Sequence, residues 1–178
     1  PLRKTFSNIL QNVASPLTFI HDILQFKGER AANTFFRFLI NSTLGLGGIF
    51  DVATDIGIPY HKEDMGLTMA NYGIEGGPYL MLPILGPSNF RDALGRLTDA
   101  FLNPLRLVLF HNDLENVYYG QLAVGTLDER ANSVDLTDRI NKTPDPYVQY
   151  RTLYLQNRSY RERDREVNTS DLPGAGDE

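Results

Sequence analysis

The sequence predicts an all-α protein with a single domain. Apolar residues recur at spacings of three and four along several segments, which is the period of a helix with one apolar face. No stretch alternates apolar and polar residues over the length of a strand, and no segment is repeated. A chain of 178 residues is long enough for one domain. We expect this domain to cover residues 1–165, and residues 166–178, which lack an apolar pattern, to form a disordered tail.

Composition and charge exclude several classes of site. The chain has no cysteine, which excludes disulfides, thiolate metal ligands and cysteine nucleophiles. A net charge of −5 argues against a nucleic-acid partner, because phosphate binding requires a basic surface. No apolar run reaches the roughly 18–20 residues of a membrane-spanning helix, so any membrane contact must come from shorter or in-plane segments. No signal peptide is visible and Pro1 is not a translation start, so we expect a fragment or a processed form.

The first two predicted helices are amphipathic. Ser15–Pro16 is expected to begin the first, because proline is favoured in a first turn, and Gly28 to end it. The second covers residues 29–44. Its apolar stripe consists of Ala32, Phe35, Phe36, Leu39 and Ile40, and its opposite side carries Thr34, Arg37 and Asn41.

A glycine turn separates the second helix from another apolar segment. Gly45, Gly47 and Gly48 end the helix, since glycine reaches left-handed conformations and allows close backbone approach. Asp51 is placed to accept hydrogen bonds from amides at the start of the next segment. In most soluble proteins, two such segments form a helix hairpin in the core.

Residues 66–86 are expected to lack regular helix. They contain five glycines together with Pro78 and Pro83. Residues 72–78 form a hairpin-like loop with mobile hinges in this interpretation, and the apolar segment after it is extended or irregular. Backbone polar groups in an apolar, irregular segment must still find partners, so we expect function to reside here.

Helices are predicted again from residue 87 onward. Ser88 is a candidate cap for the first, and Pro104 breaks or kinks it. Residues 112–115 and 126–129 resemble capping boxes, each of which would start a helix.

The last predicted helix begins at Asp145–Pro146, with Asp145 as its cap. Arg158 opens a stretch of interleaved charges, which favours a solvated helix end over a site for lipid head groups.

Catalytic and metal chemistry receive little support. His21, His61 and His111 form no pair at helical ligand spacing. A phospholipid-cleaving enzyme would need a nucleophile and a base, and Ser88 shares no recognised spacing with His61 or His111. His61 could gather a metal with Glu63 and Asp64, but the pattern favours a solvated loop. We therefore expect no enzyme, no cofactor and no metal.

Three blocks of sequence indicate a family. They cover residues 37–53, 63–92 and 145–158, and their order and spacing resemble the MlaA (VacJ) family of outer-membrane lipoproteins. Some residues match family motifs and are expected to have a structural role. They are Arg37, Asn41, Gly45, Gly48, Asp51, Arg91, Asp92, Asp145, Tyr147 and Arg151. The lipoprotein leader, the lipidated cysteine and the first helical segment of the family are absent from the sequence, and Glu75 is an insertion in the glycine loop.

The resemblance implies a ring of amphipathic helices around a central channel, lying in the inner leaflet of the Gram-negative outer membrane. It implies removal of phospholipids misplaced in the outer leaflet, which maintains lipid asymmetry. Trimeric porins and a periplasmic MlaC-like lipid carrier are the implied partners, and a lipid anchor is implied for the full-length protein. A structural adaptor on porins remains an alternative.

The resemblance also implies roles for individual residues. Its gating loop corresponds to Tyr72, Gly73, Ile74, Gly76, Gly77, Pro78 and Tyr79. We expect Gly73, Gly76 and Gly77 to permit motion of this loop. Asn41, Asp51, Arg91, Asp92 and Arg151 are expected to hold helix ends together by hydrogen bonds and ion pairs.

Overall fold

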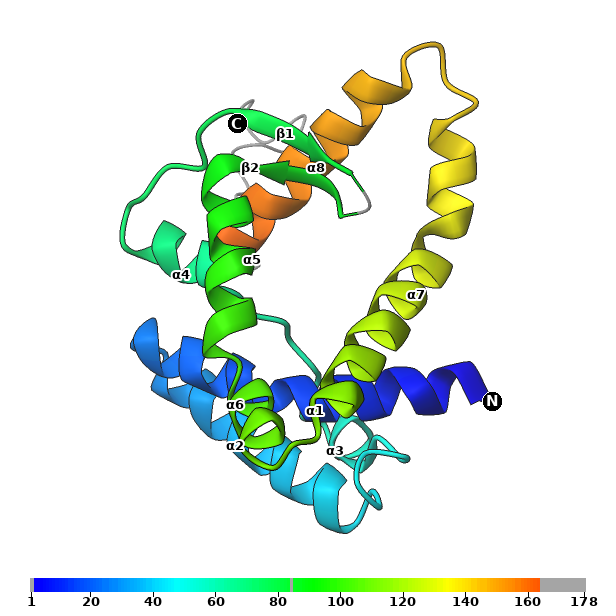
Figure 1. The fold of residues 1–178 in the computed structure, drawn as a ribbon. Coiled ribbons are helices and arrows are strands. Elements are labelled where there is room, and N and C mark those ends of the chain that lie inside the picture. The colour runs from blue at the N-terminus through cyan, green and yellow to red at the C-terminus, as the bar shows by residue number, and fades with distance from the viewer. Residues whose placement is uncertain (1, 84, 164–178) are drawn as a thin grey trace, which may run out of the picture.

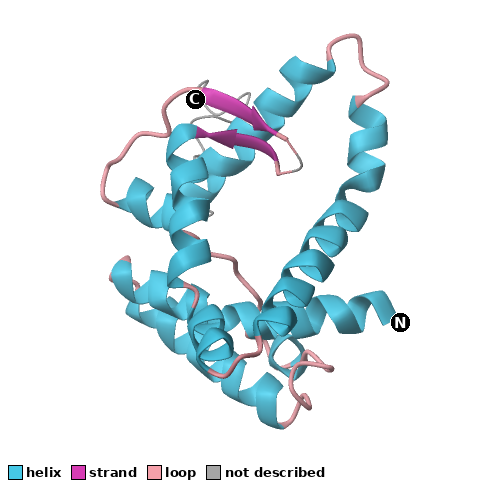
Figure 2. Ribbon diagram, in the orientation of Figure 1, coloured by secondary structure: helices cyan, strands magenta, loops and turns pink. Residues whose placement is uncertain are grey.

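The computed structural model describes residues 2–83 and 85–163, so the tail predicted at residues 166–178 lies outside the described residues. The all-α class is confirmed, with one small sheet in addition (Figure 2). The elements are α1 (Leu2–Leu24), α2 (Gly28–Thr43), α3 (Val52–Asp55), α4 (Met65–Asn71), β1 (Tyr79–Leu82), β2 (Gly86–Asn89), α5 (Phe90–Leu102), α6 (Pro104–His111), α7 (Glu115–Ile140) and α8 (Pro146–Glu162).

The helices follow a ring-like course (Figure 1). Helices α1 and α2 pack side by side at its base. From there α4 and α5 lie on one side and the long α7 rises on the other. Helix α8 returns from the far end of α7 to pack against α4 and β2. The ring therefore brings the C-terminal helix onto the middle of the chain.

Side-chain caps fix the starts of five of the described helices. Asn103 caps α6 by accepting a hydrogen bond from the Leu105 amide at 3.0 Å. Asp51, Asp64, Asn89 and Asp145 accept hydrogen bonds from the backbone amides of Thr54, Leu67, Asp92 and Val148, at 3.4, 2.9, 2.7 and 3.1 Å. Such bonds satisfy amides that have no partner within the helix. The predicted caps Asp51 and Asp145 are confirmed, whereas Asn89 replaces Ser88 as the cap of α5.

Four other predictions of elements were wrong. Helix α4 (Met65–Asn71) forms within residues 66–86, where no regular helix was expected, because the Asp64 cap starts it ahead of most of the glycines. Helix α1 runs through Pro16, and Gly28 begins α2 instead of ending α1. Helix α7 is continuous through residues 126–129, where the Thr126 hydroxyl donates to the carbonyl of Leu122 at 2.9 Å and therefore caps nothing. Serine and threonine commonly make this bond inside helices.

The segment predicted as extended or irregular forms a β-hairpin. Strand β1 pairs with β2 in antiparallel register, with Tyr79 opposite Asn89 and Leu82 opposite Gly86. The glycine loop of residues 72–78 precedes this hairpin and is not itself a strand pair. In the hairpin, the backbone amides and carbonyls of each strand find hydrogen-bond partners on the other strand, which the sequence pattern did not predict.

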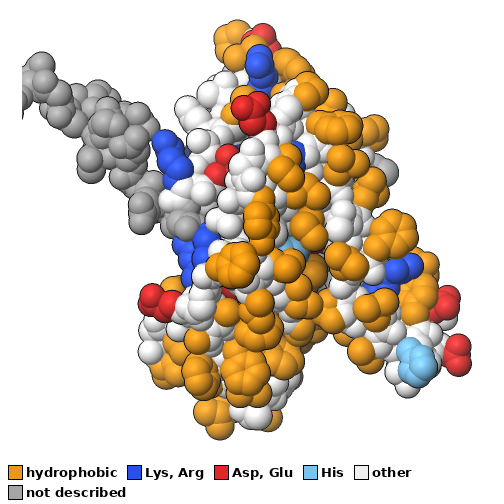
Figure 3. Space-filling view, turned by 90° about the vertical axis from the view of Figure 1, so that its left-hand side faces the viewer, with side chains coloured by type: hydrophobic (Ala, Val, Ile, Leu, Met, Phe, Trp, Pro, Cys, Tyr) orange, Lys and Arg blue, Asp and Glu red, His pale blue; other side chains and the backbone are white. Residues whose placement is uncertain are grey.

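Burial is inverted relative to a water-soluble domain. On α2, the polar side chains of Thr34, Arg37 and Asn41 are 3–4% exposed, whereas Phe35 and Phe36, on its apolar stripe, are 45% and 54% exposed. The fully buried apolar residues of the described chain are few: Ala31, Ala53, Leu67, Tyr118 and Ile140. Figure 3 shows one side of the molecule, where apolar side chains cover much of the surface. The predicted apolar stripe exists, but it faces outward.

Within the described residues, none of the helices combines the length and the apolar character that crossing a membrane requires.

Candidate functional site

The contacts between the helices are built from polar stripes. The buried polar residues of α1 recur at helical spacing, and Gln25 just after its end continues the pattern. Those on α1 are Asn12, Ser15, Thr18, His21 and Asp22. Helix α2 faces them with Thr34, Arg37 and Asn41. Buried polar groups are costly unless hydrogen-bonded, and many of those described here pair with one another in three clusters.

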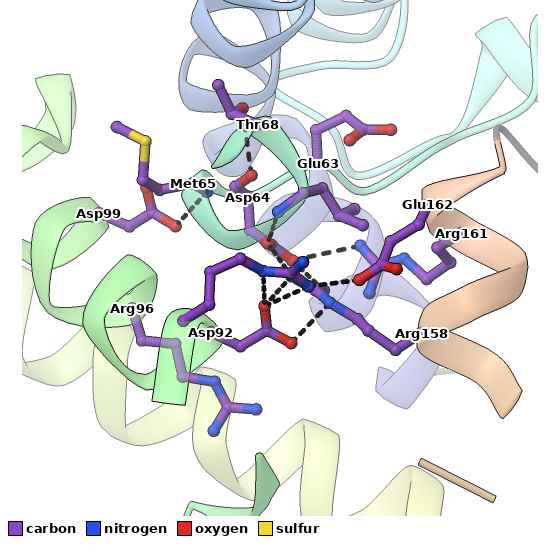
Figure 4. A network of polar contacts seen from close by, with 12 residues as sticks. Glu63, Asp64, Met65, Thr68, Asp92, Arg96, Asp99, Arg158, Arg161 and Glu162 are labelled. Carbon is purple, nitrogen blue, oxygen red and sulfur yellow. Dashed lines mark hydrogen bonds and ion pairs between the residues drawn. The ribbon is translucent and has the colours of Figure 1, made fainter. Parts of the chain in front are cut away.

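The first cluster centres on Arg158 of α8, which lies between two carboxylates (Figure 4). Its Nη1 and Nη2 donate to both oxygens of Asp64, at 2.9 and 2.6 Å. Its Nη2 and Nε face both oxygens of Asp92, at 2.9 and 2.7 Å. Arg158 therefore joins α8 to the first residues of α4 and α5. Bidentate pairs of this kind are among the strongest polar contacts in proteins.

Further side chains complete this Arg158 cluster. The Tyr154 hydroxyl donates to Asp92, and Arg91 donates from Nε to Asp92 at 3.0 Å. Arg91 also pairs with Glu162, and Arg161 donates to the carbonyl of Lys62 at 2.7 Å. Each carboxylate of the cluster thus has an arginine partner, as a buried charge requires.

The pKa values follow from these contacts. Burial alone would raise the pKa of the Asp64 carboxyl, but the hydrogen bonds and charge of Arg158 outweigh it and hold this pKa far below its ordinary value. Burial lowers the pKa of the Arg158 guanidinium, yet Asp64 and Asp92 raise it above its ordinary value. Burial and the bond to Asp92 together raise the pKa of the Tyr154 phenol. All three shifts favour the protonation states that hold the cluster together.

Two glycines leave room for this cluster. A Cβ on Gly66 would lie 2.4 Å from Arg158 Nη2 and 2.4 Å from Asp92 Oδ1. A Cβ on Gly95 would lie 2.6 Å from the backbone nitrogen of Gly66. Helices α4 and α5 therefore approach closely enough for one guanidinium to contact both of their N-terminal ends.

The second cluster, around Arg37, ties α2 to α3. Arg37 donates to Asp51 at 2.6 Å and to the Thr54 hydroxyl at 2.8 Å. Asn41 donates to Asp51 at 3.0 Å and accepts from the Ala53 amide at 3.0 Å. Burial would raise the pKa of Asp51, but its bonds to Thr54, Arg37 and Asn41 lower it overall.

The glycine turn at the end of α2 is sterically required. A Cβ on Gly45 would lie 2.3 Å from the carbonyl oxygen of Phe50. Gly48 has φ +95°, and a Cβ there would meet Asn12 at 2.6 Å. The turn therefore packs directly against the polar stripe of α1.

The third cluster surrounds Asp22. Thr34 donates to Asp22 at 2.6 Å, and the ring nitrogen Nε2 of His61 lies 3.0 Å from each oxygen of Asp22. Nearby, His21 Nδ1 lies 3.1 Å from the Thr68 hydroxyl and His21 Nε2 lies 3.0 Å from Asp99. Glu63 is buried as well, so the interpretation of residues 61–64 as a solvated loop was wrong.

The glycine loop is held to the ring by its ends and its middle. The Tyr72 hydroxyl donates to the carbonyl of Leu24 at 2.6 Å. Arg91 donates from Nη1 to the carbonyl of Ile74 and from its backbone nitrogen to that of Gly76, at 2.9 and 3.1 Å. The Phe90 amide donates to the carbonyl of Pro78 at 3.2 Å.

Positive φ angles occur at two glycines of this loop. They occur at Gly73 (φ +80°) and Gly77 (φ +68°), whereas no positive φ is found at Gly76. A Cβ on Gly76 would instead lie 2.6 Å from the side-chain nitrogen Nδ2 of Asn89. Gly73 and Gly77 have backbone conformations that favour glycine. At Gly76, a larger residue would collide with the side chain of Asn89.

An open cavity of about 830 Å³ lies between the glycine loop and α8. Both polar and apolar side chains line it. The lining residues are Glu75, Gly76, Gly77, Asn89, Leu155, Gln156, Arg158, Ser159, Glu162 and Arg163. The loop and the Arg158 cluster therefore share one surface.

The remaining predicted residues lie at the outer end of α8. The ring of Tyr79 packs edge-on against Tyr147, with centroids 5.6 Å apart, and also contacts Tyr154. The Tyr79 hydroxyl is buried without a hydrogen-bond partner among the described residues. Arg151 is exposed, and the described residues show no hydrogen bond or ion pair to it.

The structure buries residues that the sequence analysis placed in solvent or left out. Arg158 is buried, so its assignment to a solvated helix end was wrong. Asp22, Thr34 and Thr68 were not predicted as site residues. The available signal was the polar stripe at spacings of three and four on residues 12–25, which lies beside a broad apolar face.

The residues considered for catalysis lie in unrelated surroundings. Ser88 is buried on β2 and donates to the carbonyl of Asn89 at 3.3 Å. His61 pairs with Asp22 in the third cluster. His111 is exposed at the end of α6.

Comparisons with known proteins agree with this geometry. The family model described as "MlaA lipoprotein" matches residues 1–161. A solved structure described as the structural basis for maintenance of bacterial outer membrane lipid asymmetry matches with a TM-score of 0.75 at 28% identity, over 91% of this chain and 80% of that chain.

Sequence relatives point the same way. An uncharacterized protein of Rickettsia felis is 40% identical over 148 residues, which cover 82% of this chain and 57% of that protein. The intermembrane phospholipid transport system lipoprotein MlaA of Haemophilus influenzae is 29% identical over 92% of this chain and 65% of its own length. The intermembrane phospholipid transport system lipoprotein MlaA of Escherichia coli is 27% identical over 98% of this chain and 69% of its own length. The chain thus spans less than two thirds of the Rickettsia relative.

Proposed function

The chain belongs to the MlaA lipoprotein family, and from that membership and its inverted helices we propose that it removes misplaced phospholipids from the outer leaflet of the outer membrane. The lipid passes through a channel at the centre of the ring and is handed to a periplasmic lipid carrier of the MlaC type. This retrograde transfer maintains lipid asymmetry and requires no catalytic step.

One observation carries the proposal: polar side chains are buried where the helices meet, and many large apolar side chains are exposed. An apolar exterior suits helices that lie in the plane of a leaflet, where lipid tails replace water. The open cavity beside the glycine loop is lined in part by Arg158, Glu162 and Arg163, which suits a charged head group. Helix α2 shows both features, because Phe35 and Phe36 are exposed whereas Arg37 is buried.

The glycine loop is the proposed gate of the channel. Its carbonyls are bonded to the start of α5, and it borders the cavity beside the Arg158 cluster. Gly73 and Gly77 are the hinges, since both have φ angles that other residues rarely adopt. In this proposal the loop segment between them moves while α5 and α8 stay fixed.

The proposed setting is the inner leaflet and periplasmic side of the Gram-negative outer membrane, with a lipid anchor in the full-length protein. Trimeric porins are the proposed partners, since a leaflet-bound ring needs a protein neighbour that reaches the outer leaflet. The apolar outer surface is compatible with contact to both lipid tails and a porin wall.

The test is the outer-leaflet phospholipid content of cells that lack their own MlaA homologue. The chain is restored behind a lipoprotein leader, and a soluble domain on the same leader serves as the control. We expect a fall in outer-leaflet phospholipid with the chain and none with the control. No change, despite outer-membrane placement and porin association, would favour the alternative of a structural adaptor.

Two further measurements separate the alternatives. Phospholipid copurifying with the protein supports transport, whereas lipid-free protein bound to porin supports an adaptor. Accumulation of lyso-phospholipid or free fatty acid on restoration would instead indicate a phospholipid-modifying enzyme.

A further inference from the structure

We propose that Asp22, His61 and Glu63 form a binding site for one divalent transition-metal cation, with Zn²⁺ as the best match. One potential ligand atom from each of these residues lies within 4.8 Å of the other two. The inference is independent of the lipid-transport proposal, because it rests on this cluster alone.

The three residues come from separate parts of the chain. Asp22 lies in the last turns of α1, whereas His61 and Glu63 lie in the connection between α3 and α4. Asp22 is 0% exposed and Glu63 is 6% exposed, while the His61 side chain keeps partial access to solvent. A cation there would have two buried anionic ligands and a route to enter past the imidazole.

The distances suit a shared metal. His61 Nε2 lies 3.0 Å from both carboxylate oxygens of Asp22. Neighbouring ligands on a metal with bonds of about 2.0–2.2 Å are separated by roughly 3–3.5 Å, given the bond lengths of zinc sites. One imidazole with two carboxylates is a donor set that zinc accepts, and water can take the remaining position.

The charge of Asp22 also favours a cation. Its side-chain partners in the described structure are His61 and the Thr34 hydroxyl, and neither an arginine nor a lysine contacts it. A fully buried carboxylate needs a compensating positive charge, which either an imidazolium or a metal can supply. Thr34 donates to Asp22 from the opposite helix, which fixes the carboxylate as outer-shell groups do at metal sites.

Glu63 has competing neighbours. Gln25 donates to one of its oxygens at 3.0 Å, and Arg30 lies 3.4 Å from the other. The Arg30 side chain is partly exposed, so it can turn away when Glu63 takes up the cation. Bound metal would then fasten α1 to the segment that leads into the Arg158 cluster.

The experiment is Zn²⁺ titration of the purified chain in detergent micelles after chelator treatment, followed by calorimetry and elemental analysis. We expect one equivalent of bound Zn²⁺ and a higher melting temperature with metal. His61→Gln and Asp22→Asn should weaken binding by about tenfold or more, as removal of supporting groups already does at known sites. His111→Gln, at an exposed histidine of α6, is the matched control and should bind as the wild type does.

Melting in the presence of chelator shows which variants are folded. If Asp22→Asn does not fold, His61→Gln and Glu63→Gln decide the matter, because both leave the buried aspartate in place. Absence of an equivalent of Zn²⁺ in the wild type overturns the proposal. Equal loss of binding in His111→Gln, or full binding in folded His61→Gln, overturns it as well.

Discussion

The two faces of α2 differ in polarity and in burial, because its polar face is buried and its apolar face is exposed. Its inner face carries Thr34, Arg37 and Asn41, which hydrogen-bond to groups on α1, α3 and neighbouring loops. Its outer face exposes Phe35, Phe36 and Leu39. A water-soluble domain gains most of its stability by burying such apolar groups. In this molecule the helices are joined by paired polar groups, and the apolar face of α2 stays exposed.

Substitutions on the two faces of α2 should therefore have different effects. An inner change should reduce folding stability, since it leaves a buried polar partner without its bond. An outer change should reduce membrane partition and leave the internal contacts intact.

The largest effect is expected for Arg158→Met. It leaves Asp64 and Asp92 without their shared guanidinium, and breaking a buried pair in this way costs about 3–5 kcal/mol. Urea unfolding in micelles measures the loss. Arg151→Met, an exposed change on the same helix, is the control and should stay within about 0.5 kcal/mol of the wild type.

A combined variant sharpens this prediction. Asp64→Asn, Asp92→Asn and Arg158→Met together remove both uncompensated charges, and the asparagines can still accept hydrogen bonds at the helix starts. The triple variant should therefore recover part of the loss seen with Arg158→Met alone. Equal or greater destabilisation would mean that the ion pairs contribute net stability.

A smaller effect, on partition instead of folding, is expected for the double variant Phe35→Ser and Phe36→Ser. Full burial of a phenylalanine side chain is worth about 1.5–3 kcal/mol, and Phe35 and Phe36 are 45% and 54% exposed. The pair is therefore worth about 1.5–3 kcal/mol in lipid, and vesicle binding should fall roughly tenfold to a hundredfold. Co-sedimentation with phospholipid vesicles measures it. Thr34→Val, the adjacent inner residue, should keep vesicle binding and lose folding stability, because Asp22 loses a hydrogen bond.

Acid should weaken the inner face through Asp64. Its pKa in the folded protein lies far below the ordinary value of 3.8, so its stabilisation is fully present above that value. It is lost as pH falls through the folded pKa, where Arg158 loses a charged partner. The free energy of unfolding should therefore decline below about pH 4. Asp64→Asn should flatten this decline, and an unchanged slope would assign it to other carboxylates.

The sequence predicted the two faces of α2 but not which of them is buried. Spacing separates Thr34 and Arg37 from Phe35 and Phe36 without regard to the surroundings. In water the apolar face would turn inward, so the ordinary rule gave the opposite orientation. The family resemblance, with its leaflet-bound ring, carried the information that the pattern lacked.

The Arg158 cluster could not be predicted from neighbouring residues in the sequence. Arg158 stands among alternating charges, which are typical of a solvated helix end. Its partners Asp64 and Asp92 lie 94 and 66 positions earlier in the chain. By contrast, Asp51 and Asp145 were predictable as caps, because a cap contacts amides only three positions away.

The smallest effect on stability is expected for Gly73→Ala at the proposed hinge. Gly73 has φ +80°, its amide donates to the Ala70 carbonyl at 2.8 Å, and no atom lies within 4 Å of an added Cβ. The cost is therefore backbone strain of about 1 kcal/mol. Gly57→Ala is a close match elsewhere, with φ +92°, a similar bond to Thr54 at 3.1 Å and equally open space. Both variants should lose the same small amount of stability, but only Gly73→Ala should change outer-leaflet phospholipid in the restored cells. If the two behave alike in cells, the glycine loop is part of the scaffold and the gate lies elsewhere on the ring.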